Sequence, residues 1–340
     1  MTMGLFGRAA AALALALTTI VPVQARDGTL ESQFDSAFGT DVRTPRDFSS
    51  TFQAPISQQI MQLASAADGR IGVAALDLTT GQELAVLGDQ RFPMASTSKI
   101  AIAATFMAGV DQGRWTLDSR FALRVPVPSK PFSSAAAPTR AGQLLSARTL
   151  LELMITRSSN EAADALLHAV GGPQAVNAWV HNTAGIMDFN LTRDIATLVR
   201  DDGAINPAVQ VDVRDSATPR AMVQLVSGIY QGKWLSISSR DAIVGAMERC
   251  RTSKRRLRAQ MPADVTIADK TGTLANVASD VGILSTADGH QIAVAIYVTG
   301  QGGKFNRSAK IASLGRAIYD NYLSQPTGRQ YASATYATGQ

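Results

Sequence analysis

Ser96 and Lys99 are the first side chains whose types and spacing could support chemistry. They lie in the segment 92–106, where a proline and small polar residues precede an Ala-rich apolar run. This pattern is typical of the start of a helix. Residues three apart share a helix face, so the Ser96 hydroxyl and the Lys99 amine could meet as a nucleophile and a base. The alternative is a capping serine beside a solvated lysine, and S-x-x-K alone does not decide between them.

A second candidate segment, 157–161, separates two helical runs and offers a hydroxyl and an amide two residues apart, Ser158 and Asn160. As structure, Ser158 and Glu161 fit an S-x-x-E capping box that would open the following helix. As chemistry, Ser158 could relay a proton to a leaving group. Asn160 could hold an amide substrate or a catalytic lysine.

A third segment, 269–273, reads Asp-Lys-Thr-Gly-Thr and falls between two strand-like runs. The amine of Lys270 and the hydroxyls of Thr271 and Thr273 could bind a carboxylate at the edge of a strand. Gly272 permits the backbone to approach a ligand closely.

Together, S-x-x-K, S-x-N and K-T-G in this order resemble the motif set of the penicillin-recognising serine enzymes, in particular class A β-lactamases. The likeness spans about residues 51–324. It implies a serine hydrolase that opens the β-lactam ring through a Ser96 acyl-enzyme, with Lys99 as base or proton relay. The backbone amides of Ser96 and Thr273 would form the oxyanion hole, and Ser158 would pass a proton to the lactam nitrogen.

The resemblance also implies that Lys270, Thr271 and Thr273 hold a substrate carboxylate. Family members add an arginine to this grip, either from the next strand or from about fourteen residues before the lysine. Arg256 lies fourteen residues before Lys270, so it is the expected carboxylate ligand, with Thr252 at a matching place before it. The alternative for Arg256 is the one expected for the other arginines of the basic cluster at 249–258, a solvated surface.

The segment 200–215 resembles the omega loop of class A β-lactamases. Arg200 and Asp215 occupy the positions of the salt bridge that closes the loop, and Asn206 matches the asparagine that helps to hold the deacylating water. The family carries glutamate four residues before this asparagine, whereas this chain has Asp202, one methylene shorter. Asp201 is a weaker substitute. Since a displacement near 1 Å can cost on the order of 10² in rate, deacylation is the step in doubt.

Two further departures concern Ser159, where the S-D-N motif has aspartate, and Leu274, where a glycine often follows K-T-G-x. Asp202 and Leu274 leave two alternatives open. One is a D,D-peptidase or small-ester hydrolase with the same acylation machinery. The other is a slowly deacylating protein that binds β-lactams.

The pattern of helices and strands expected around these residues predicts an α+β fold. An antiparallel sheet flanked by helices would come from 51–88 and 248–324, and an inserted all-helical domain, 89–247, would carry the omega loop. Ser96 would lie where the two parts join, a common place for a ligand cleft. The expected elements are a helix at 55–67, strands at 71–76, 83–87, 265–268, 281–284 and 292–298, helices at 147–156, 162–170 and 308–323, and a proline-rich loop at 126–138.

Length and composition bound the remaining possibilities. With 340 residues, of which 46% are hydrophobic, the chain can bury a large core. Residues 1–25, with Arg8, an apolar run and Val23-Gln24-Ala25, have the form of a signal peptide. A flexible lead-in is expected at 26–50 and a disordered tail at 325–340. We therefore expect an exported, periplasmic or secreted monomer with no membrane span after signal removal.

Several classes of partner are not indicated. The net charge of +5 is not accompanied by a nucleic-acid-binding motif. The only cysteine, Cys250, excludes an intrachain disulfide. His168, His181 and His290 are not at metal-ligand spacing, so no metal and no organic cofactor are expected. A small-molecule β-lactam remains the expected partner.

Overall fold

The computed structural model describes residues 42–43, 55–66, 68–78, 81–286 and 289–324. The signal peptide and the tail expected from the sequence lie outside the described residues, as does most of the lead-in. Within that lead-in, strand β1 (Val42–Arg43) pairs with β8 (Val211–Asp212). Among the described helices, none combines the length and the apolar composition that crossing a membrane requires.

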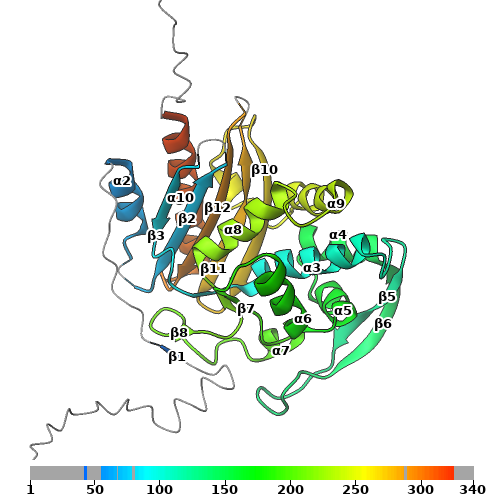
Figure 1. The fold of residues 1–340 in the computed structure, drawn as a ribbon. Helices are drawn as coiled ribbons and strands as arrows, with labels where there is room; N and C mark the ends of the chain where they lie inside the picture. The colour runs from blue at the N-terminus through cyan, green and yellow to red at the C-terminus, as the bar shows by residue number, and fades with distance from the viewer. Residues whose placement is uncertain (1–41, 44–54, 67, 79–80, 287–288, 325–340) are drawn as a thin grey trace, which may run out of the picture.

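A five-stranded antiparallel sheet joins the two ends of the chain (Figure 1). Strand β12 pairs with β2, so the C-terminal strands continue the N-terminal hairpin, as the sequence predicted. The strand order is β10 (Thr266–Leu274), β11 (Val277–Ser285), β12 (Gln291–Thr299), β2 (Ile71–Asp77) and β3 (Glu83–Val86). The strand β10 that carries K-T-G is therefore an edge strand.

Strand β12 is buried on both faces of the sheet. Successive side chains of a strand point in opposite directions, so they enter two different clusters. Ile292, Val294 and Ile296 belong to one hydrophobic cluster, whereas Ala293 and Tyr297 belong to another. Helices α2 (Pro55–Ala64) and α10 (Lys304–Ser324) cover the first face, and α8 (Pro219–Tyr230) covers the second (Figure 1). The sheet is thus the middle layer of three.

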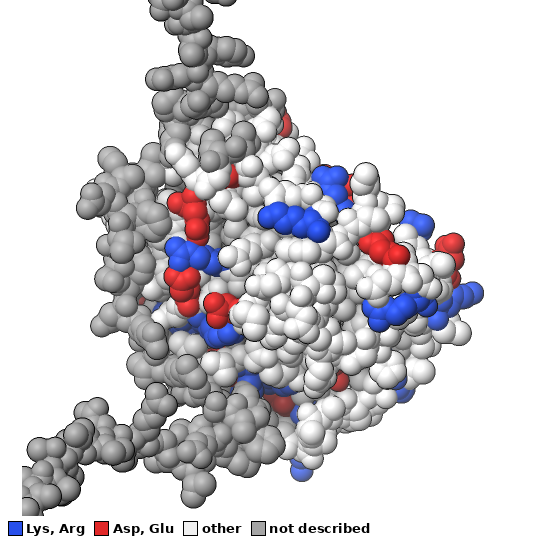
Figure 2. All heavy atoms as spheres, in the orientation of Figure 1, with Lys and Arg blue, Asp and Glu red and all other residues white. Residues whose placement is uncertain are grey.

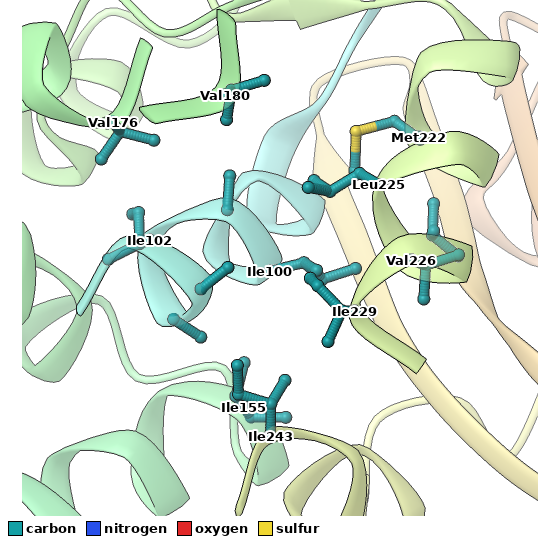
Figure 3. Close-up of a cluster of buried hydrophobic side chains, with 14 of the residues drawn as sticks. Ile100, Ile102, Ile155, Val176, Val180, Met222, Leu225, Val226, Ile229 and Ile243 are labelled. Atoms are coloured by element: carbon teal, nitrogen blue, oxygen red, sulfur yellow. The ribbon is translucent and has the colours of Figure 1, made fainter. Parts of the chain in front are cut away.

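Helix α3 (Lys99–Asp111) lies at the centre of the second cluster. Its residues are apolar all around, which is typical of a helix with no solvent face. Ile100 and Ile102 project from it toward different neighbours, and Ile155, Ile229 and Ile243 approach it from other helices (Figure 3). The packing of α3 fixes the direction in which its N-terminal end points, and that end carries the candidate nucleophile.

The middle of the chain differs from the predicted all-helical domain. Strands β5 (Arg120–Pro126) and β6 (Thr139–Ser146) form an antiparallel hairpin on either side of the predicted proline-rich loop, in a region expected to be helical. Phe121 and Leu123 of β5 and Leu145 of β6 pack against the core. The prolines at 126–138 lie at and beyond the end of β5, in the connection between the strands. They do not interrupt the pairing, but they hid the strand pattern in the sequence.

Helix α8 also departs from the predicted division at residue 247, because it packs on the sheet rather than within a separate helical domain. The remaining helices are α4 (Ala147–Thr156), α5 (Asn160–Val170), α6 (Pro173–Ala178), α7 (Ile195–Arg200) and α9 (Ile237–Glu248), with the short turns η1 (Ala95–Ser98), η2 (Trp179–Thr183) and η3 (Leu257–Ala259). The remaining strands, β4 (Phe92–Pro93), β7 (Phe189–Asn190) and β9 (Ser216–Ala217), form a small sheet of their own.

Charged side chains are dispersed over the face of the molecule drawn in Figure 2. Lysine and arginine alternate there with aspartate and glutamate, and no broad area of one sign is formed. The surplus of positive charge is therefore not gathered into a surface suited to nucleic acid on this face.

Candidate active site

Ser96 lies in the 3-10 turn η1, directly before α3 begins at Lys99. The preceding residue, Ala95, has a left-handed backbone with φ of 50°. Such a conformation costs energy in a residue with a Cβ and persists only where the surroundings impose it. Here Met94 N donates to the carbonyl of Asp215 at 2.9 Å, and Thr97 Oγ1 donates to the carbonyl of Met94 at 2.7 Å. The turn that presents Ser96 is thus held from both sides.

Strand β10 passes directly against this turn because residue 272 is glycine. A Cβ at Gly272 would lie 2.7 Å from the carbonyl oxygen of Met94 and 3.0 Å from the Cβ of Ala95. Any side chain would push the strand away from the nucleophile. The segment 269–273 was expected between two strands, but it lies inside β10, which runs on to Leu274. The edge of a regular strand therefore forms one wall of the site.

Lys99 is completely buried and makes three hydrogen bonds to the S-x-N segment. Its Nζ donates to the carbonyl of Ser158 at 2.7 Å, to Asn160 Oδ1 at 2.7 Å and, more weakly, to Ser158 Oγ at 3.4 Å. Ser158 has a left-handed backbone, with φ of 59°. The structure thus brings two of the three sequence motifs into contact, and Asn160 holds the lysine, one of the two roles considered for it.

The capping residue of α5 is Ser159, and the expectation that Ser158 forms the capping box is wrong. Ser159 Oγ accepts a hydrogen bond from Ala162 N at 3.1 Å and donates to Glu161 Oε2 at 2.9 Å. Because the next residue serves the helix, the Ser158 hydroxyl is available to the site. Lys270 Nζ donates to Ser158 Oγ at 2.9 Å, so the third motif joins the first two at this oxygen.

Burial weakens the basicity of both lysines. The pKa of Lys99 lies well below its ordinary value, first because burial disfavours its charge and second because Lys270 is close by. Asp164 and Glu161 oppose this shift. Burial also lowers the pKa of Lys270, to about 8. The lowered pKa favours the neutral Lys99 amine, whose two N–H groups suffice for the two bonds of 2.7 Å and whose lone pair can accept a proton. Lys270 is still largely charged at neutral pH.

Arg256 lies at the same strand edge and is not solvated. Its Nη1 donates to the carbonyls of Gly272 and Ser279, each at 2.7 Å, and its Nη2 donates to Thr273 Oγ1 at 2.6 Å. Thr252 Oγ1 is 2.5 Å from Thr271 Oγ1. The structure therefore places Arg256 at the expected strand edge, and its role toward a carboxylate stays a prediction.

The expectation that the other arginines of the cluster are solvated is wrong for Arg258. Its guanidinium binds the buried carboxylate of Asp269 at 2.6 Å and the carbonyl of Ile267 at 2.6 Å. Arg249 pairs on the surface with Glu152 at 2.7 Å.

Asp202 and Asn206 are exposed and face the turn between β10 and β11. Both carboxylate oxygens of Asp202 accept from Ala275 N, at 2.9 and 3.0 Å. Asn206 Oδ1 accepts from Ala208 N at 3.2 Å and from Asn276 Nδ2 at 3.4 Å. Within the described part of the chain, these hydrogen bonds attach the loop to the sheet rather than to the nucleophile.

The salt bridge at the neck of the loop uses a different arginine from the one predicted. Arg193 Nε contacts Asp215 Oδ2 at 2.6 Å, and the amides of Thr192 and Arg193 donate to Asp215 Oδ1 at 2.8 and 3.0 Å. Arg200 pairs with its neighbour Asp201 at 2.7 Å. The helix α7 stands between Arg193 and Arg200, so spacing carried over from the family selected the arginine at the wrong end of that helix.

Asp164 is a site residue that the sequence analysis did not single out. It is buried, and its two oxygens accept from Ile195 N at 2.7 Å and Ala196 N at 2.8 Å, at the start of α7. Burial raises its pKa to about 7. Its position four residues after Asn160 places both on one face of α5, and this spacing is the signal that could have revealed it.

Among the described residues, no group of three histidine, cysteine, aspartate or glutamate side chains is arranged to hold a metal ion. The site that the structure assembles consists of hydroxyls, amines, an amide and a guanidinium. This set suits nucleophilic attack on a carbonyl whose substrate carries an anionic group.

Comparison with known proteins agrees with this geometry. The family model of the β-lactamase enzyme family matches residues 55–322. β-Lactamase L2 of Stenotrophomonas maltophilia is 32% identical over 225 residues, which cover 65% of this chain and 70% of L2. A solved ancestral (GNCA) class A β-lactamase is 35% identical with a TM-score of 0.68, covering 78% of this chain and 99% of that one.

A PBP-A mutant, solved as an acyl-enzyme complex with penicillin G, is 28% identical with a TM-score of 0.67. That match covers 79% of this chain and 97% of PBP-A. The family model alone spans most of the described residues. The chain therefore belongs to the β-lactamase enzyme family, among the class A serine β-lactamases.

Proposed function

We propose that this β-lactamase works through a Ser96 acyl-enzyme whose formation depends on a neutral Lys99. Ser96 Oγ attacks the lactam carbonyl while its proton passes to Lys99 Nζ. The backbone amides of Ser96 and Thr273 stabilise the developing oxyanion. The observation that carries this proposal is the convergence of Lys99 and Lys270 on Ser158 Oγ, at 3.4 and 2.9 Å.

Ser158 is the proton donor to the lactam nitrogen in this proposal. When the carbonyl carbon forms its bond to Ser96 Oγ, the C–N bond of the lactam breaks and its nitrogen takes up a proton. Ser158 Oγ supplies that proton and recovers it from Lys99, which returns to the neutral amine. The charge of Lys270 beside Ser158 Oγ makes the hydroxyl a better donor during this step.

Lys270, Thr271 and Thr273 bind the substrate carboxylate, and Arg256 supports them from behind the strand edge. Arg256 Nη1 already donates to two backbone carbonyls. Arg256 therefore assists carboxylate binding through Thr273. Because Thr273 Oγ1 accepts from Arg256 Nη2, its own proton is directed away from the guanidinium and is available to a carboxylate. Arg256 also adds positive charge at the strand edge.

Deacylation is assigned to water activated by Asp202, with Asn206 beside it. To act as the base, the Asp202 carboxylate must exchange its bond to Ala275 N for one to water. This requirement supports a second candidate function, a slowly deacylating penicillin-binding protein or D,D-peptidase. The PBP-A mutant, which has a similar structure, was solved as an acyl-enzyme complex with penicillin G.

Intact-protein mass spectrometry after mixing with benzylpenicillin tests both candidates. We expect an adduct on Ser96 that forms and then disappears as hydrolysed penicillin accumulates. An adduct that persists would favour slow release, and release of D-alanine from a terminal D-alanyl-D-alanine peptide would identify the peptidase. Absence of any adduct would refute the acyl-enzyme mechanism.

Export is part of the proposal and rests on the form of residues 1–25. Expression of the full chain in a Gram-negative host, followed by fractionation, tests it. We expect the mature protein in the periplasm or medium with an N-terminus at Arg26. Retention of residues 1–25 on a cytoplasmic product would contradict it.

A further inference from the structure

Two aspartates in the sheet, Asp269 on β10 and Asp280 on β11, are completely buried, and the mechanism above uses neither. In the antiparallel register, Asp269 lies opposite Gly282 and Thr271 lies opposite Asp280. The two aspartates are therefore diagonal neighbours on one face of the sheet. Gly282 leaves room for them, because a Cβ there would lie 2.8 Å from the Cβ of Asp269. Asp269 contributes to the raised pKa of Asp280, so the two carboxyl groups lie close enough to affect each other's charge.

Each carboxyl group has one oxygen with a partner and one without. Asp269 Oδ1 accepts from Arg258 Nε at 2.8 Å, and Asp280 Oδ2 accepts from the Leu257 amide at 3.3 Å. Asp269 Oδ2 and Asp280 Oδ1 are buried and have no hydrogen-bond donor among the described residues. Two ionised carboxylates would repel each other here, and both free oxygens would stay unpaired. One proton between them removes both costs, since one group then donates to the other.

We propose that Asp269 and Asp280 hold one shared proton, and that this singly charged pair positions Arg256 at the substrate-binding edge. The pair binds both residues that follow Arg256: Asp280 accepts from the Leu257 amide, and Asp269 binds the Arg258 guanidinium. With these two residues fixed, the Arg256 guanidinium reaches β10 at the carbonyl of Gly272 and the hydroxyl of Thr273. Asp269 and Asp280 are thus positioning residues, one layer behind the groups that touch the substrate.

The surrounding charges agree with a pair of net charge −1. Arg256 and Arg258 face it from the segment after α9, Lys270 follows Asp269 in β10, and Cys250 lies beside it. Burial, and after it the charge of Asp269, places the pKa of Asp280 well above its ordinary value. Burial also raises the pKa of the Cys250 thiol, which therefore faces the pair as a neutral group. The negative charge of the pair is balanced by Arg258. The positive charge that attracts the substrate carboxylate is therefore not neutralised by the pair.

Infrared difference spectroscopy tests the shared proton without reference to activity. Asp280→Asn keeps the shape of the side chain, and its amide can donate to Asp269 Oδ2. At pH 7 we expect the wild-type spectrum to contain one protonated carboxylic acid C=O band that the variant lacks. The subtraction removes the contribution of Asp164. Identical numbers of such bands in wild type and Asp280→Asn would overturn the proposal.

The positioning role rests on the proposed function and has its own readout. In Asp280→Ala we expect KM for benzylpenicillin to rise about tenfold, equivalent to roughly 1.4 kcal/mol, with little change in kcat. Asp280→Asn should restore KM to within about twofold of wild type, as the loss of one neutral hydrogen bond would allow. The methyl ester of benzylpenicillin, which lacks the carboxylate, should show no such rise in either variant.

Equal KM effects for the acid and the ester would refute the positioning role, because they would indicate a general loss of structure. Failure of Asp280→Asn to restore KM would refute it as well. A wild-type protein that hydrolyses neither compound would refute the proposed function instead. The infrared measurement would still decide the shared proton in that case.

Discussion

The acylating part of the site and the loop that would release the acyl group are built in different ways. Lys99 is fully buried and joined to the S-x-N segment by two hydrogen bonds of 2.7 Å. Asp202 is exposed, and its carboxylate is engaged by a backbone amide of the β10–β11 turn. Groups held by buried contacts need no rearrangement before reaction, whereas Asp202 must give up a hydrogen bond first.

In the proposed mechanism, the two half-reactions therefore depend on different parts of the fold. Attack by Ser96 would depend on the sheet edge, α3 and the start of α5, which are packed on the main hydrophobic cluster. Release would depend on the segment that follows α7, attached through Asp164 and Asp215. Changes in the two parts should therefore separate in kinetics.

The largest effect should come from Ser96→Ala. Removal of the nucleophile should abolish the adduct and lower the rate of benzylpenicillin hydrolysis by at least about 10³-fold. Mass spectrometry and a spectrophotometric hydrolysis assay measure the two quantities. Ser238→Ala, at an exposed serine of α9, is the matched control and should behave as wild type. Residual turnover near the wild-type rate would remove Ser96 from the mechanism.

Changes at Asp202 should affect release but not attack. In Asp202→Ala we expect the acylation rate to stay within about threefold and deacylation to fall by about 10² or more, the usual range for a lost general base. Asp202→Glu, with one more methylene, should release the acyl group faster than wild type. Stopped-flow acylation and the lifetime of the adduct separate the steps. Equal adduct lifetimes in wild type and Asp202→Ala would show that another group activates the water.

The pH dependence should distinguish the two lysines. Since burial sets the pKa of Lys270 at about 8, its charge and its attraction for a carboxylate are lost as pH rises through that value. We expect kcat/KM for benzylpenicillin to fall about tenfold for each pH unit above the pKa. Lys270→Arg should shift the fall to higher pH, because arginine keeps its charge. A profile of kcat/KM that stays level up to pH 10 would contradict this assignment.

The smallest expected effect concerns the neck of the loop. Arg193→Ala breaks the partly buried pair with Asp215 and should reduce the free energy of unfolding by about 1–3 kcal/mol. Adduct lifetime should lengthen, since the loop loses its closure. Arg200→Ala removes a pair with an adjacent residue and should have a smaller effect. Urea denaturation of the two variants makes the comparison, and a larger loss for Arg200→Ala would contradict the observed pairing.

Motif order and periodicity were enough to identify the candidate reactive residues and the elements that carry them. Ser96, Lys99, Ser158, Asn160 and Lys270 were identified from motif order, and the structure places the last four in contact. The sheet and its covering helices followed from periodicity, because alternation and helical spacing are local properties that burial preserves. Those signals act over a few residues, so one sequence suffices to read them.

The pairings between distant residues became visible only in the folded structure. Asp215 pairs with Arg193 instead of Arg200, and the buried Asp164 holds α7. The diagonal placement of Asp269 and Asp280 on one face of the sheet likewise depends on strand register. Each pairing joins segments that are far apart in the chain, and distance along the chain does not tell how close two segments lie in space. That closeness depends on how all the helices and strands of the core pack together.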